Sequence, residues 1–98
     1  MSSTEVVREI LSKEGYSGSD EFAREGVLVL ALSRLEQYRG EIECYEKKYG
    51  MAFKEFESLV HAHKEGEDFV KEADIEDWEF ALNALKWWEV KVKELKHA

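Results

Sequence analysis

Proline is absent from this 98-residue chain, cysteine occurs once, and the only amide side chains are Gln37 and Asn83. Because proline interrupts helices, a chain without proline can form long uninterrupted helices. The single thiol, Cys44, cannot form a disulfide within the chain, which agrees with a reducing compartment. The scarcity of amides beside abundant Glu and Lys leans towards a thermophilic source.

Long apolar runs are also missing. The longest is 27–32, six residues, whereas a membrane-spanning helix needs about 20. The N-terminus lacks the basic start and apolar stretch of a secretory signal, so we expect a cytoplasmic protein. With 44% hydrophobic and 37% charged residues, the composition is too apolar for a disordered chain, and the length fits one globular domain over residues 1–98.

The formal net charge of −8 repels phosphate groups and anionic lipid heads. Direct binding of nucleic acid or of a membrane surface is therefore disfavoured. An acidic protein more naturally binds a basic protein, although a net charge can also serve solubility alone.

Hydrophobic periodicity predicts helices at about residues 4–14, 20–49, 52–64 and 74–97. In the second and fourth of these, apolar residues recur in the a/d pattern of a coiled-coil seam. The seam positions are Leu28, Ala31, Leu35, Tyr38, Ile42, Tyr45 and Tyr49, and Trp78, Ala81, Leu85, Trp88, Val92 and Leu95. We therefore expect an all-α fold, in which an antiparallel hairpin of two long helices and two shorter helices form a small helical bundle.

Helix ends are indicated by particular residues. Ser2 or Ser3 can cap the first helix, while Gly15 and Gly50 can end the first and second. Asp74 is the expected N-cap of the last helix. The acid-rich segment before it, within residues 65–79, is the expected connector.

Local signatures of catalysis are missing: there is no Gly-rich phosphate loop, no Cys-x-x-Cys pair and no Gly-x-Ser-x-Gly elbow. Cys44 lies slightly to one side of the seam and is expected to be half-buried and inert. We expect no enzyme and no cofactor.

Histidine spacing gives a metal site little support. His61 and His63, two apart on a helix, point in different directions and cannot chelate one ion. Glu94 and His97 have the Glu-x-x-His spacing of di-iron bundles, but only one copy occurs. A helical metal site built from Glu57, His61, Glu94 and His97 is kept only as an alternative.

Aromatic residues are more numerous on the last helix than one seam can use. Phe80 and Trp87 fall on a second line, offset from the Trp78 seam, where they pack either internally or against another molecule. Exposed aromatic clusters favour interfaces. The predicted partner-binding residues are Phe80, Trp87, Glu67, Asp68, Glu72 and Asp77.

The stretch YEKKYGMAFKEFE, residues 45–57, and the later EDWEFA, residues 76–81, resemble segments of small prokaryotic all-helical proteins regarded as antitoxin-like. The resemblance extends over roughly residues 20–97 and implies a non-enzymatic protein that binds and masks a small toxin. This chain departs from the antitoxin plan because it has no basic DNA-binding module, which puts operator binding in doubt.

Three functions remain open at this point. The first is a protein-binding module, antitoxin-like, for a basic partner. The second is a structural homo-oligomer, with a dimer favoured, in which the same aromatic residues pair chain with chain. The third is a metal-binding helical protein.

Overall fold

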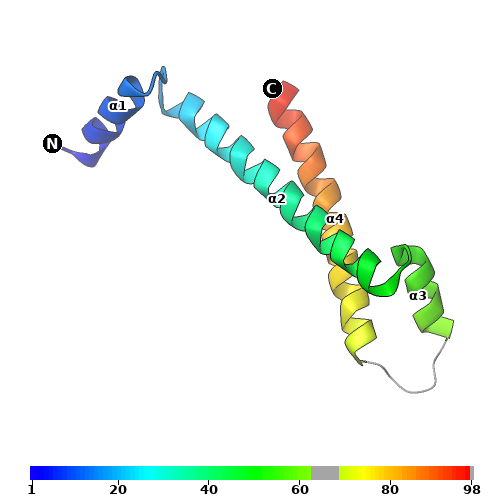
Figure 1. Ribbon diagram of the computed structural model, residues 1–98. Helices are drawn as coiled ribbons and strands as arrows, with labels where there is room; N and C mark the ends of the chain where they lie inside the picture. The colour runs from blue at the N-terminus through cyan, green and yellow to red at the C-terminus, as the bar shows by residue number, and fades with distance from the viewer. Residues whose placement is uncertain (63–68, 98) are drawn as a thin grey trace.

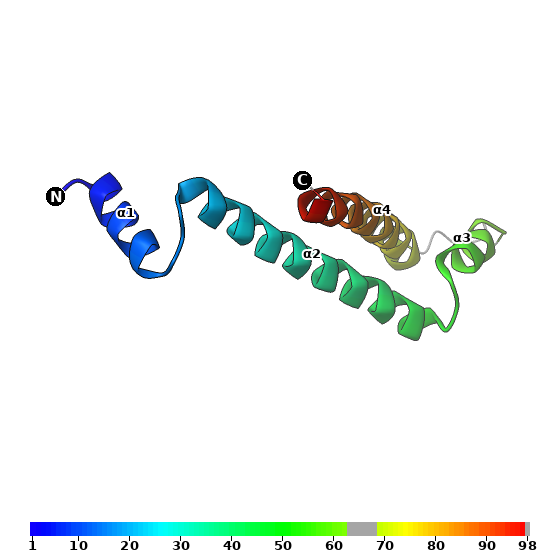
Figure 2. The same ribbon diagram turned by 90° about the horizontal axis from the view of Figure 1, so that it is seen from above.

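The fold, a computed structural model, is described over residues 1–62 and 69–97. These residues form four α-helices and no strand: α1 (Ser3–Lys13), α2 (Ser19–Tyr49), α3 (Phe53–Ala62) and α4 (Phe69–His97). Helix α4 packs against both α2 and α3, whereas α1 projects beyond the start of α2 (Figures 1 and 2). The expected all-helical class and the packing of the two long helices are confirmed.

Three helix ends follow the expected chemistry. The Ser2 hydroxyl accepts a hydrogen bond from the Glu5 backbone N–H at 3.2 Å, which satisfies a free donor in the first turn of α1. Gly15, with φ +89°, follows α1, and Gly50, with φ +64°, ends α2. Both adopt the left-handed conformation that glycine reaches without steric cost.

The start of α4 differs from the prediction. The helix is already formed at Phe69, five residues before Asp74. Asp74 therefore does not cap the helix, and its carboxylate instead accepts hydrogen bonds from α2. The prediction treated the acids of this segment as a connector, but acidic side chains stabilise the first turns of a helix through its dipole. Residues 63 and 64, at the predicted end of α3, lie outside the described residues.

Two clusters of buried side chains hold the long helices together. One contains Ile42, Phe53, Phe56, Ile75, Trp78 and Ala81, and the other contains Ala31, Leu35 and Val92. Each predicted seam position either belongs to one of these clusters or packs against one. The periodicity therefore identified the core side of both long helices.

Trp78 is the centre of the larger cluster. Its side chain is fully buried, and rings from α2 and α3 surround it. Tyr45 and Tyr49 stack on the indole with centroids 5.6 and 6.3 Å away, and Phe53 and Phe56 approach to 5.4 and 5.8 Å. Such ring pairs each contribute about 0.5–1.5 kcal/mol beyond the burial of their area.

Contacts between the long helices join opposite ends. Arg24, near the start of α2, donates a hydrogen bond of 3.0 Å to the Leu95 carbonyl near the end of α4, whereas Lys48 contacts Asp74 at the other ends. The molecule is elongated, with extents of 67 × 29 × 17 Å and a radius of gyration of 20.7 Å. A compact chain of this length would have a radius of gyration of about 13 Å. Much apolar surface is consequently left uncovered.

The burial of Trp78 gives a stability prediction. Trp78→Ala should lower the free energy of unfolding by about 3–5 kcal/mol, because it removes the ring around which three helices pack. Phe69→Ala is the matched control, since Phe69 is on the same helix and 71% exposed, and it should change stability by less than about 1 kcal/mol. Urea unfolding followed by circular dichroism at 222 nm measures both. Equal losses for the two variants would contradict the packing described.

Candidate functional site

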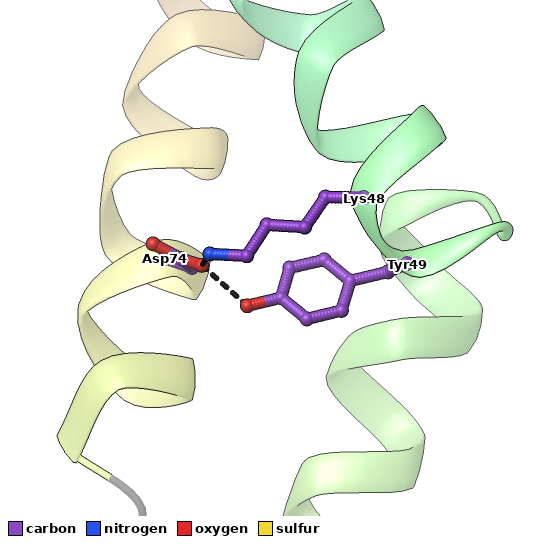
Figure 3. Close-up of polar contacts among 3 residues, drawn as sticks. All are labelled: Lys48, Tyr49 and Asp74. Atoms are coloured by element: carbon purple, nitrogen blue, oxygen red, sulfur yellow. Dashed lines mark hydrogen bonds and ion pairs between the residues drawn. The ribbon is translucent and has the colours of Figure 1, made fainter.

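The joint between the end of α2 and the beginning of α4 is polar (Figure 3). Lys48 Nζ lies 2.7 Å from Asp74 Oδ2, and the Tyr49 hydroxyl donates a hydrogen bond to the same carboxylate oxygen. The Asp74 side chain is only 15% exposed, whereas that of Lys48 is 52% exposed. This joint fixes the register of the two long helices where the Trp78 cluster begins.

Charges at the joint shift the pKa values of its three groups. The hydrogen bonds from Lys48, and then from Tyr49, hold the pKa of Asp74 below its ordinary value. The bond to Asp74 raises the pKa of Lys48, and burial together with that carboxylate raises the pKa of Tyr49. Each group is therefore held in the protonation state that it already has at neutral pH. The joint thus links α4 to α2 through hydrogen bonds that Asp74 accepts from Lys48 and Tyr49.

Beside the joint lies a surface that we name the acidic–aromatic patch, formed by Tyr38, Glu41, Tyr45, Asp77 and Phe80. Phe80 is 63% exposed and meets the Tyr38 ring edge-on, with centroids 6.1 Å apart. Burial raises the pKa of Tyr45, and the negative charges of Asp77, Asp74 and Glu41 raise it further. The Tyr45 hydroxyl consequently remains protonated among carboxylates. Aromatic rings flanked by carboxylates are suited to binding Arg and Lys side chains.

A second surface, which we name the apolar groove, lies further along the same two helices. It has a volume of about 420 Å³ and is formed by Val27, Leu30, Trp87, Trp88 and Leu95, with Ala31 at its floor and Lys91 and Glu94 at its edge. Trp87 is 54% exposed, packs edge-on against Trp88 at 4.9 Å, and has Lys91 Nζ 5.3 Å from its ring. The groove can bury apolar side chains of another segment.

The predicted partner-binding residues do not form one site. Phe80 and Asp77 lie in the acidic–aromatic patch, while Trp87 lies in the apolar groove, seven residues on and on the same side of α4. Glu72 is exposed but about 140° around the helix from Asp77, as five residues of an α-helix dictate. Glu67 and Asp68 lie outside the described residues.

The cysteine and two of the histidines considered for chemistry lie apart from one another, each on a different helix. Cys44 is exposed rather than half-buried, so that prediction is wrong: the seam passes through Ile42 and Tyr45 and leaves Cys44 on the solvent side of α2. His61 is exposed on α3, far along the chain from His97 at the end of α4. Across residues 1–62 and 69–97, no three His, Cys, Asp or Glu side chains are grouped so that they could hold a metal ion.

Sequence reasoning missed the α2 contribution to both surfaces. Glu41, Val27 and Leu30 are not among the partner-binding residues predicted from the sequence. The signal was present, because Val27, Leu30, Arg34, Tyr38, Glu41 and Tyr45 recur at spacings of three and four along one flank of α2. What the sequence does not state is that this flank adjoins the Phe80 and Trp87 side of α4.

Comparisons with known proteins give no relative. No family model matches this chain, and neither the curated proteins nor the solved structures contain a match. Within the part of the chain that the structure describes, no helix has the length and apolar character needed to cross a membrane.

The joint predicts a pH dependence of stability. Asp74→Asn should lower the free energy of unfolding by about 1–3 kcal/mol at pH 7, because a charged acceptor of two hydrogen bonds is lost. Folding lowers the pKa of Asp74 from 3.8, so its stabilisation is complete above that value and is lost as the pH falls through the lower, folded-state pKa.

Urea unfolding of wild type and Asp74→Asn, compared at neutral pH and near pH 2, measures this dependence. The difference between the two proteins should shrink on acidification. Glu79→Gln, an exposed acid on the same helix, is the control and should change little at either pH. A difference for Asp74→Asn that stays constant down to pH 2 would rule out the ionised joint.

Proposed function

We propose that this chain is a non-catalytic protein-binding module that binds a basic protein at the acidic–aromatic patch. In this proposal α2 and α4 form an antiparallel hairpin with a coiled-coil-like seam, which serves as a rigid platform for the patch. The observation that carries the proposal is the exposure of Phe80, 63%, beside the Tyr38 ring and three residues after Asp77 on the same side of α4. A large exposed aromatic ring with acids around it is typical of a surface that another protein covers.

The distribution of charge supports a basic partner. Residues 40–82 contain thirteen acids and five bases, which accounts for the whole net charge of −8, whereas the remaining residues contain nine of each. Four of the five patch residues, all but Tyr38, belong to this acidic stretch, and Tyr38 and Tyr45 pack against the cluster that includes α3 residues. In Figure 1 this is the end of the molecule where α3 lies beside the two long helices. A local field of one sign speeds encounter with a partner of the opposite sign.

The aromatic residues would supply the affinity that charge alone does not. Exposed acids lose much of their attraction in salt, because screening is effective beyond about 8–10 Å at physiological ionic strength. Buried aromatic anchors typically contribute about 2 kcal/mol or more each to an interface. An Arg side chain of the partner would stack on Phe80 or Tyr38 and donate hydrogen bonds to Asp77 or Glu41.

A biological role that fits such a module is antitoxin-like: an acidic helical protein that covers and neutralises a basic toxin in the cytoplasm. The resemblance of residues 45–57 and 76–81 points in the same direction, and these two segments contribute Tyr45, Asp77 and Phe80 to the patch. In this role the protein needs no catalytic group, since masking the partner is sufficient.

The test compares variants of the tagged full-length protein used to capture partners from its own cells at moderate salt. Wild type should co-elute with a stoichiometric basic protein. Asp77→Lys and Phe80→Ala should each reduce its recovery at least tenfold, because one reverses a charge of the patch and the other removes its anchor. Glu79→Lys makes the same charge change two residues away, on the other side of α4, and should retain the partner.

The comparison between Asp77→Lys and Glu79→Lys shows whether the partner binds at the acidic–aromatic patch. Equal recovery of the same protein with both would show that any binding is general electrostatic attraction or lies elsewhere. Absence of a basic protein from the wild-type eluate, in cells shown to contain the chain, would also contradict the proposal.

A further inference from the structure

Helix α1 has an apolar side that the described chain leaves largely uncovered. Val6, Val7 and Ile10 are 39%, 49% and 56% exposed, and Leu11 is the buried residue of this helix. With 11 residues, α1 is shorter than the roughly 12–15 at which an isolated helix becomes even marginally stable in water. The helix therefore needs a surface on which to pack.

The loop that follows α1 directs it away from the rest of its own chain. The Tyr16 hydroxyl donates a hydrogen bond of 2.7 Å to Glu25, and the Tyr16 ring meets Phe22 edge-on at 5.3 Å. Ser17 donates from its backbone N–H and its hydroxyl to Glu21 at 2.8 and 2.6 Å. Held in this way, α1 extends beyond the start of α2, on the side away from α4 (Figures 1 and 2).

The apolar groove offers a surface of the kind that α1 lacks. Its five residues are apolar, and three of them, Val27, Leu30 and Trp87, are about half exposed, at 48%, 48% and 54%. An amphipathic helix whose apolar residues are spaced three and four apart commonly binds in such a groove between two helices. Val6, Val7 and Ile10 have this spacing.

The charge of the part of the molecule that holds α1 and the groove does not oppose contact between two copies. The residues outside 40–82, which include α1 and all of the groove, carry nine acids and nine bases. Two acidic ends would repel each other, but two neutral ends do not. At the groove edge Lys91 and Glu94 pair with each other, with Nζ 3.4 Å from Oε1, so this edge carries one charge of each sign.

We propose that helix α1 of one copy lies in the apolar groove of a second copy, in a reciprocal two-fold dimer. If the three apolar side chains of α1 and the five of the groove each bury about 80 Å², one contact buries roughly 640 Å², and two-fold symmetry doubles it to roughly 1,280 Å². That value is near the lower end of the 1,200–2,000 Å² typical of specific interfaces. The dimer uses the groove and leaves the acidic–aromatic patch open, so it does not depend on the proposed binding of a basic protein.

Disulfide trapping tests this arrangement directly. In a Cys44→Ser background, one protein carries Ile10→Cys on α1 and another carries Leu30→Cys in the groove. Mixed in equal amounts at about 50 μM and mildly oxidised, they should form mainly the mixed disulfide, since only cysteines whose Cα atoms approach within about 7 Å can be bridged. Intact mass on non-reducing samples identifies each product. Ile10→Cys mixed with Val90→Cys, which lies outside the groove, is the control for random collision.

Each other product would contradict the proposal. A predominant Leu30→Cys homodimer would mean that grooves pair with grooves. An internal disulfide in a chain carrying both substitutions would mean that α1 folds back on its own groove. Mixed product no greater than in the Val90→Cys control would mean that α1 does not bind there.

A second measurement does not rely on new cysteines. Sedimentation equilibrium of the wild-type chain should give twice the monomer mass at high concentration. Val7→Glu should raise the dimer dissociation constant at least tenfold, because it places a charge on the apolar side of α1, whereas Val90→Glu should leave it within twofold. A monomeric wild type throughout, or equal effects of the two variants, would overturn the proposal.

Discussion

Burial of the Trp78 indole against rings from α2 and α3 is the interaction on which the other parts of this molecule depend. The indole is inaccessible to solvent, as is nearly all of Phe56, and Tyr45 and Tyr49 stack on it from the long helix. Full burial of one large side chain contributes about 1.5–3 kcal/mol. Since α3 packs through the same rings, losing Trp78 would free α3 and the adjoining halves of both long helices together.

The two ends of the molecule are built differently as a consequence. The Trp78 end has three helices, six buried apolar residues in one cluster, a polar joint at Asp74 and all of the net negative charge, which residues 40–82 carry. The other end has two helices held by Ala31, Leu35 and Val92, with no net charge and many half-exposed apolar side chains. One end is suited to presenting acids and rings on a rigid support. The other end has more half-exposed apolar surface that contact with another copy can bury.

Periodicity predicted the all-helical class and the packing of α2 against α4 because each long helix has a continuous apolar stripe. Leu28, Leu35 and Ile42 on one helix, and Trp78, Leu85 and Val92 on the other, recur every seven residues, and a helix has only one way to bury such a stripe. The start of α4 was misplaced because Glu and Asp were taken as signs of a connector. Near a helix N-terminus these acids are favourable. The Asp74 carboxylate accepts its hydrogen bonds from Lys48 and Tyr49 of α2 rather than from backbone N–H groups of α4.

The candidate site was predicted only in part, for a reason that lies in tertiary packing. Phe80 and Trp87 were found because they exceed what one seam can bury. Glu72 and Asp77 are equivalent in the sequence pattern, yet they lie on different sides of α4, and of the two only Asp77 is a cause of the raised pKa of Tyr45 on α2. Which flank of α2 adjoins which flank of α4 depends on how the two helices pack, and periodicity within each helix does not contain that information.

Native-state hydrogen exchange, residue by residue, tests most directly the central claim that stability is concentrated around Trp78. At low protein concentration the slowest amides should belong to residues 42–49, 53–60 and 75–82, where opening requires exposure of the whole aromatic cluster. Amides of residues 19–31 and 88–97 should exchange faster, because fewer buried contacts hold that end. Slowest exchange at residues 19–31 and 88–97, with rapid exchange around Trp78, would contradict the account.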